Sequence, residues 1–232
     1  MQAWIGGRDA AYRRACQTTG MLTTVVDHPL VAHKLTALRD VHTGSPAFRQ
    51  LADDLTTLLG YEATRTIEVV HRQVHTPVGT ADGVELATPV PLIVPIMRAG
   101  IGMLDALARL LPEADIGFVG LVRDEQTLVA STYATRLPTD LTGRAAFILD
   151  PMLATGGSME TAITMLLDRG AAAVTAICLL AAPEGLARLG TAFPSGSAPV
   201  HVVTACVDSK LNDKGYILPG LGDAGDRLFG TL

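Results

Sequence analysis

The residues with the clearest chemical potential form one continuous run, Asp150 to Ser158, which reads Asp-Pro-Met-Leu-Ala-Thr-Gly-Gly-Ser. An apolar segment ends in the carboxylate of Asp150, a loop of small residues follows, and an amphipathic helix is expected directly after it. The paired glycines let the backbone pass close to a ligand, and the free N–H groups at a helix N-terminus attract anions. Thr155 and Ser158 add hydroxyl donors. The run therefore predicts a phosphate-binding loop, with Asp150 placed to accept hydrogen bonds from the hydroxyl groups of a sugar.

Other interpretations of such a loop can be compared with the sequence. An ordinary strand-to-helix turn with Ser158 as the helix N-cap would use the same residues. A Walker loop is excluded, because no lysine follows the glycines. The letters of a dinucleotide fingerprint occur at residues 220–225, but only seven residues follow them, too few for the helix and return strand of that unit.

The elements that must position this loop alternate along the chain. Apolar runs predict strands at residues 92–96, 116–122, 145–149, 174–180 and 200–207. Apolar residues at helical spacing predict helices at about 103–111, 158–169 and 183–189, after two earlier helices, one capped by Asp27 and one opened by Ser45. Buried strands that alternate with helices indicate an α/β fold with a largely parallel sheet flanked by helices. Residues 66–88 alternate around Pro77 and Gly79, which predicts a β-hairpin.

Composition limits the classes of function. The chain has 232 residues, 48% hydrophobic and 18% charged, which suits one globular domain at 21–232 after an N-terminal extension at 1–20. The net charge is −5 and no block of basic residues occurs, so we expect no nucleic acid partner. The longest apolar run is shorter than the about 18 residues of a membrane span, and no signal-peptide core is present. Cys16, Cys178 and Cys206 lie far apart, which fits a reducing cytoplasm.

The loop also carries a resemblance. Its order of residues resembles the phosphoribosyl-pyrophosphate loop of phosphoribosyltransferases, and a single acid followed by Pro-Met-Leu-Ala-Thr-Gly-Gly-Ser resembles the uracil phosphoribosyltransferases in particular. Four collinear segments agree with that family: His28 to Leu35, Pro95 to Gly100, Arg123 to Glu125, and Tyr216 to Gly230. The family pattern differs at Val122, at Gln126 and at residues 208–215.

The resemblance implies a fold, a reaction and a set of roles. It implies a phosphoribosyltransferase-type sheet with a β-hairpin arm and a small base-binding hood at the C-terminal end, and the synthesis of UMP in pyrimidine salvage from uracil and 5-phospho-α-D-ribose 1-diphosphate (PRPP). PRPP would be bound by Arg98, Arg123, Asp150, Pro151, Met152, Leu153, Ala154, Thr155, Gly156, Gly157, Ser158 and Asp223. Uracil would be bound by Ile217, Gly222, Asp223 and Ala224. Catalysis would rest on Asp150, Arg98, Arg123 and Asp223, and Asp223 would also face Mg²⁺ carried mostly by the diphosphate.

The same resemblance implies a homodimer or higher homo-oligomer and leaves activation by GTP open. Two alternatives also stay open: a PRPP-sensing regulator that binds RNA, and a transferase for another base such as orotate. His71 and His75 are four residues apart, but in a β-hairpin this spacing favours solvated residues over a metal site. We expect His28 and His33 to order the first helix.

Overall fold

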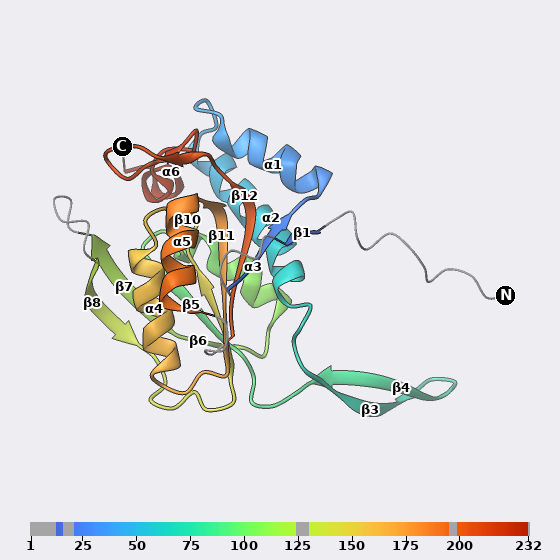
Figure 1. Ribbon diagram of the computed structural model, residues 1–232. Coiled ribbons are helices and arrows are strands. Elements are labelled where there is room, and N and C mark those ends of the chain that lie inside the picture. Colours follow the sequence, from blue (N-terminus) through green and yellow to red (C-terminus); the bar gives the residue numbers. More distant parts are fainter. Residues whose placement is uncertain (1–12, 16–20, 124–129, 195–198, 232) are drawn as a thin grey trace.

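The computed structural model describes residues 13–15, 21–123, 130–194 and 199–231 (Figure 1). Its centre is a sheet with the strand order β1-β2-β12-β11-β9-β5-β7-β8. The six inner strands β2, β12, β11, β9, β5 and β7 run parallel, and β1 and β8 lie antiparallel at the two edges. The bounds are β1 Arg13–Ala15, β2 Leu22–Val26, β5 Leu92–Met97, β7 Phe118–Arg123, β8 Ala130–Arg136, β9 Ala145–Leu149, β11 Ala173–Ala181 and β12 Val200–Val207. Two short strands, β6 Asp115–Ile116 and β10 Met152–Leu153, pair with β5 and β11. The expected largely parallel sheet is confirmed.

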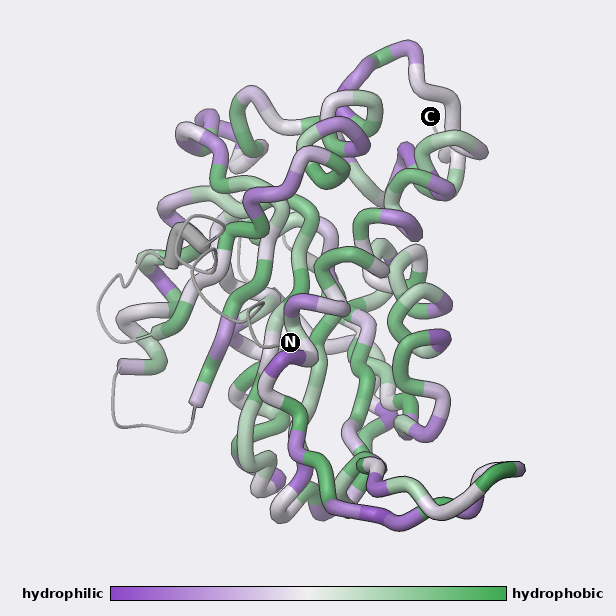
Figure 2. Tube along the Cα trace, turned by 90° about the vertical axis from the view of Figure 1, so that its right-hand side faces the viewer, coloured by the Kyte–Doolittle hydropathy of each residue, from purple (hydrophilic) through white to green (hydrophobic). Residues whose placement is uncertain are grey.

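Helices cover both faces of this sheet (Figure 1). One layer holds α1 Pro29–Arg39, α2 Ser45–Ala63 and α3 Ile101–Leu110, and the other holds α4 Gly157–Leu167 and α5 Pro183–Ala192. Successive strand residues face opposite layers: in β9, Phe147 and Leu149 pack with the α1–α3 layer, whereas Ala146 and Ile148 pack with the α4–α5 layer. Hydrophobic residues accordingly follow the inner strands along their length (Figure 2).

Several local expectations need correction. The N-cap of α1 is His28, whose Nδ1 accepts a hydrogen bond from the Leu30 N–H at 3.1 Å, so the expectation for Asp27 was wrong by one residue. In α4 the N-cap is Gly156, with φ +82°, which excludes Ser158 in that role. The run expected as one strand at 116–122 is divided between β6 and β7.

The strand β8 was not expected at all. Its residues, Ala-Ser-Thr-Tyr-Ala-Thr-Arg, show no apolar alternation because the strand lies at an edge and is mostly exposed. Its pairing with β7 relies on backbone hydrogen bonds, which any residue except proline can make.

Two segments extend from the layered body. The expected hairpin is confirmed as β3 Val69–Thr76 paired with β4 Gly79–Leu86, and it projects away from the rest of the chain (Figure 1). The hood, residues 209–230, contains β13 Lys210–Leu211, β14 Ile217–Leu218 and α6 Ala224–Phe229. It lies beside α1 and α2 at the carboxyl ends of the sheet strands (Figure 1). Among the described residues, no helix is both long and apolar enough to cross a membrane.

Candidate active site

A pocket of about 820 Å³ lies between the carboxyl ends of the parallel strands and the hood. The strand β5 leads into it at Arg98, and β9 leads into it at Asp150. Ten of the residues predicted to bind substrate line this one space: Arg98, Asp150, Pro151, Met152, Ala154, Ser158, Ile217, Gly222, Asp223 and Ala224. The structure therefore brings together the phosphate loop and the base segment, which are about 60 residues apart in the sequence.

The other predicted residues lie differently. The side chain of Leu153 is buried in the core, because this residue pairs with Ala181 as part of β10, so only its backbone could serve a ligand. Thr155, Gly156 and Gly157 form the turn into α4 and are not among the residues that line the pocket. Arg123 is the last residue of β7, and its side chain lies outside the described residues, as do Gln126 and its neighbours. The role of Arg123 stays a prediction.

The turn into α4 has two features of an anion site. The first turn of α4 receives no side-chain cap from the described residues, so its N–H groups remain available to a ligand. The hydroxyl Oγ1 of Thr155 is buried and has no hydrogen-bond partner there. A buried hydroxyl without a partner is rare in a folded protein, and a bound anion would supply the missing acceptor.

The turn after β5 approaches the end of β9 closely at one glycine. A Cβ atom on Gly100 would lie 2.2 Å from the backbone oxygen of Leu149, which is too close for any side chain, so this position requires glycine. Arg98 lies two residues before Gly100 and Asp150 directly follows Leu149, and both residues line the pocket. The Asp150 carboxylate is oriented from its own loop, because its Oδ1 accepts a hydrogen bond from the Met152 N–H at 3.3 Å. A cation and an anion thus line the same pocket, as a ligand with both phosphate and hydroxyl groups requires.

Asp223 has a structural role that the sequence did not indicate. It is the N-cap of α6, and its Oδ1 accepts a hydrogen bond from the Asp226 N–H at 2.9 Å. Its Oδ2 makes no hydrogen bond with the described residues, so that oxygen can face a ligand in the pocket it lines. The carboxylate can therefore cap α6 with one oxygen and contact a substrate with the other at the same time.

Sequence reasoning missed Asp213 and Lys214, which also line the pocket. They form the tip of the β13–β14 turn, where Asn212 Oδ1 accepts hydrogen bonds from the N–H groups of Lys214 and Tyr216 at 3.0 and 2.9 Å. Both side chains are exposed at the pocket mouth. The Asn-Asp-Lys-Gly motif within residues 208–215 predicts a turn, but it does not indicate that the turn lies at a binding site.

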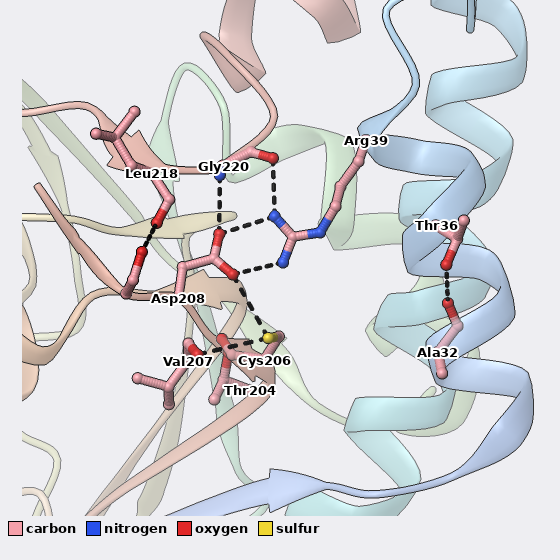
Figure 3. Close-up of polar contacts among 10 residues, drawn as sticks. Ala32, Thr36, Arg39, Thr204, Cys206, Val207, Asp208, Leu218 and Gly220 are labelled. Carbon is pink, nitrogen blue, oxygen red and sulfur yellow. Dashed lines mark hydrogen bonds and ion pairs between the residues drawn. The ribbon is translucent and has the colours of Figure 1, made fainter. Parts of the chain in front are cut away.

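The contacts that hold the hood were also missed. Arg39, the last residue of α1, makes two hydrogen bonds with Asp208, at 2.7 and 2.6 Å, and a third with the Gly220 carbonyl at 2.8 Å (Figure 3). Burial raises the pKa of Asp208, but the hydrogen bonds from Arg39 and from the Gly220 N–H outweigh it and leave that pKa below its ordinary value. The hydrogen bond to Asp208 raises the pKa of Arg39. Both groups are therefore charged at neutral pH.

Arg227 in α6 makes a second anchor. Its guanidinium carbon lies 4.4 Å from the centre of the Phe48 ring of α2, in a cation–π contact. Its nitrogens donate hydrogen bonds to the backbone carbonyls of Leu221 and Asp40, at 2.9 and 2.6 Å. The hood is thus fixed to α1, α2 and the loop between them.

The donor atoms in the pocket can be compared with the needs of Mg²⁺. Asp150, Asp213 and Asp223 contribute carboxylates to the lining, but within the described ranges no three acidic, histidine or cysteine side chains form a cage for a metal. Mg²⁺ commonly binds through one or two carboxylates together with substrate phosphates. The residues present therefore fit a Mg²⁺ ion that arrives on a diphosphate, with Asp223 and Asp150 as the nearby carboxylates.

The fold and the site have known counterparts. The adenine phosphoribosyl transferase of Trypanosoma brucei, solved with AMP, pyrophosphate and ribose-5-phosphate, shares the fold with a TM-score of 0.52 over 87% of this chain and 88% of its own, at 13% identity. The AQ2163 protein of Aquifex aeolicus is more similar, with a TM-score of 0.83, 38% identity, and coverage of 90% of this chain and 98% of its own. The fold and the phosphate loop together define a phosphoribosyltransferase.

The sequence comparisons narrow this class. The family model described as uracil phosphoribosyltransferase matches residues 25–231. Uracil phosphoribosyltransferases of Kineococcus radiotolerans and of a Nocardioides species are each 63% identical to this chain over 212 residues, which is 91% of this chain and the whole of each relative. The chain belongs to the uracil phosphoribosyltransferase family.

Proposed function

We propose that this chain transfers the phosphoribosyl group of PRPP to uracil, with release of UMP and diphosphate, as a step of pyrimidine salvage. The observation that supports the proposal is one pocket lined both by the phosphate loop, at Ala154 and Ser158, and by the base segment, at Ile217 and Gly222 to Ala224. A donor of a sugar phosphate and a planar base can meet in that space. The family membership of the chain supports the same reaction.

The reaction needs electrostatic stabilisation more than covalent chemistry. A ring nitrogen of uracil attacks the anomeric carbon of the ribose while the bond to diphosphate breaks, so positive charge grows on the sugar and negative charge on the leaving group. The N–H groups of the turn into α4 hold the 5′-phosphate, and Asp150 accepts hydrogen bonds from the ribose hydroxyls. Arg98 and Arg123 face the diphosphate, whose charge increases as the bond breaks.

Uracil offers a planar edge of alternating carbonyl and N–H groups. The backbone around Gly222 can pair with that edge because glycine keeps side-chain atoms out of the way. Orotate would need a cation for its carboxylate, and the base segment from Tyr216 to Asp226 contains no lysine or arginine; the nearest lysine along the chain, Lys214, lies at the pocket mouth. Turnover with uracil, orotate and hypoxanthine in parallel tests the proposal, and a clear preference for any base other than uracil would contradict it.

Mg²⁺ is part of the proposal. The ion would neutralise charge on the diphosphate, and Asp223 would hold its position through the oxygen that does not cap α6. Calorimetric titration of PRPP with and without Mg²⁺ tests this, and Asp223→Asn should weaken binding only when Mg²⁺ is present. An equal loss without Mg²⁺ would restrict Asp223 to its capping role.

We further propose a homodimer or larger homo-oligomer, and a cytoplasmic location. All residues of β3 are exposed, although a two-stranded hairpin has little stability by itself in water. A second copy of the chain packed on the β3–β4 hairpin would bury its exposed valines, among them Val70 and Val84.

The unpaired thiols of Cys178 and Cys206 support a reducing compartment. Activation by GTP is a separate proposal that rests on the family resemblance. Light scattering and turnover with and without GTP test the assembly and the activation, and a monomer at assay concentration would contradict the first.

A further inference from the structure

Arg39 and Asp208 lie outside the pocket lining but fix the backbone between its two base-facing segments. Both groups of the Gly220 backbone are engaged: its N–H donates to Asp208 Oδ2 at 2.9 Å, and its carbonyl accepts from Arg39 at 2.8 Å (Figure 3). Ile217 precedes Gly220 and Gly222 follows it, and both line the pocket. The position of this backbone therefore depends on two side chains from distant elements, α1 and the end of β12.

The arrangement leaves little freedom for Gly220. Its φ is +62°, and an added Cβ atom would lie 2.1 Å from the Ile217 backbone oxygen, so glycine is required. Flexible glycine backbone needs external contacts to hold one conformation, because it loses more conformational entropy on ordering than other residues do. The ion pair between Arg39 and Asp208 supplies those contacts.

The pair is suited to a fixed geometry. The Asp208 side chain is 4% exposed and that of Arg39 is 22% exposed, so solvent screens the pair weakly. The two guanidinium nitrogens bond the two carboxylate oxygens, which fixes the relative orientation of both groups. The Cys206 thiol adds a contact of 3.5 Å with Asp208 Oδ1. A lysine in place of Arg39 could not reproduce this fork.

We propose that Arg39 and Asp208 are positioning residues for the base site, which hold Gly220 and thereby set the affinity for uracil without contact with either substrate. The proposal rests on the proposed function, since it assigns uracil to the segment at Ile217 and Gly222 to Ala224. The side-chain hydrogen bonds of the pair reach Gly220 and Cys206 and do not reach the phosphate loop, which is anchored in the sheet through β9 and β10. Loss of the pair should therefore affect uracil and PRPP unequally.

Steady-state kinetics of Asp208→Asn, Arg39→Lys and Arg39→Gln test this. We expect the KM for uracil to rise roughly 10- to 100-fold, the range that follows from loss of a charge-assisted hydrogen bond. The KM for PRPP should change by less than about threefold, and kcat at saturating uracil should be largely retained, because the bound geometry can still form. Arg39→Lys should be the mildest variant. The double variant Arg39→Gln/Asp208→Asn should be no worse than the more affected single variant, because both lose the same interaction.

Arg144→Gln is the matched control. Arg144 is also a half-buried arginine with an acidic partner, Asp115 at 2.7 Å, and it bonds the Val90 carbonyl at 2.8 Å, but it lies at the opposite end of the strands. The Arg144→Gln substitution should lower the melting temperature and leave both KM values unchanged.

Equal rises of both KM values in the Arg39 and Asp208 variants, or a loss of stability alone as in the control, would overturn the proposal. If Asp208→Asn does not fold, Arg39→Lys decides the question by the same criterion. A wild-type protein without uracil turnover would overturn the proposed function and this proposal together, whereas an active wild type with unselective variants would overturn only the role of the pair.

Discussion

The phosphate loop at residues 150–158 and the hood at residues 209–230 line the same pocket, but different kinds of contact hold them in place. The loop continues a buried strand and leads directly into α4, so its backbone is fixed by the sheet and the helix on either side. The hood has only short strands and one short helix, and it depends on Arg39, Asp208 and Arg227 for its position. On the proposed function, the phosphate group contacts backbone fixed by the sheet, and the base contacts a segment held in place by long-range side-chain contacts.

This difference has a consequence for substitutions. We propose that the charged side chains at the ends of β5, β7 and β9 act on the ligand directly, so their loss should change kinetics and leave the fold intact. Side chains that anchor the hood act on the protein first, so their loss should change stability and uracil affinity together. The four predictions that follow test this division, beginning with the largest expected effect.

Arg98→Ala and Arg123→Ala should impair the use of PRPP far more than that of uracil. The diphosphate gains negative charge in the transition state while uracil stays neutral, so a cation near the diphosphate favours the transition state. By analogy with the loss of an oxyanion donor, kcat/KM for PRPP should fall by an amount equivalent to about 2–4 kcal/mol. Lysine at either position should restore activity only in part. If one alanine variant mainly raises the KM for uracil and keeps its turnover, that arginine belongs to the hood side of the division.

Asp150→Asn should weaken PRPP binding and lower turnover without loss of stability. The carboxylate lies at the end of β9 on the pocket rim, and its replacement removes a charge-assisted hydrogen bond to a ribose hydroxyl, equivalent to about 1.5–3 kcal/mol. Kinetics with both substrates and a urea denaturation curve provide the measurement. Wild-type kinetics in a folded variant would remove Asp150 from the site.

Arg227→Gln should lower stability and uracil affinity and spare PRPP binding, which is the opposite of the pattern expected for Asp150→Asn. It removes the stacking on Phe48 and the hydrogen bonds to the Leu221 and Asp40 carbonyls, so the free energy of unfolding should fall by about 1–2 kcal/mol. The KM for uracil should rise and the KM for PRPP should stay near its wild-type value. Arg65→Gln serves as the control, because Arg65 also stacks on an aromatic ring, that of Tyr61, but its side chain is 48% exposed. An Arg227 variant as stable as the control would show that the hood does not depend on this anchor.

A chain that begins at Met21 should keep nearly full activity. Every residue that lines the pocket lies after this point, and the family model begins at residue 25. The deletion removes β1, an edge strand of three residues, so the free energy of unfolding should change by no more than about 0.5 kcal/mol. Turnover and the melting temperature check this. A large loss of either would give the first 20 residues a role in the fold that the pocket geometry does not indicate.

The same division explains what could be predicted from the sequence. The loop was predictable because its signals are local: an apolar strand, an acid, paired glycines and a helical apolar pattern are adjacent in the chain. The hood could be assigned only through the family resemblance, because its anchors join residues far apart, such as Arg39 and Asp208, which are separated by 169 in the numbering. No spacing rule relates such residues. The edge strand β8 and the short helix α6 were missed for a related reason, since neither has a long apolar pattern.

The position of the hood on α1 and α2 also affects the order in which the parts of the pocket form during translation. The ribosome makes the elements that receive the hood, which end at Ala63, long before it makes the hood itself. A nascent chain can therefore form most of the sheet, including the phosphate loop, while Gly220 and Arg227 have not yet left the ribosome. On the proposed function, the base site is therefore the last part of the pocket to form, and a chain that terminates early would keep the loop at residues 150–158 but lack the segment proposed to bind uracil.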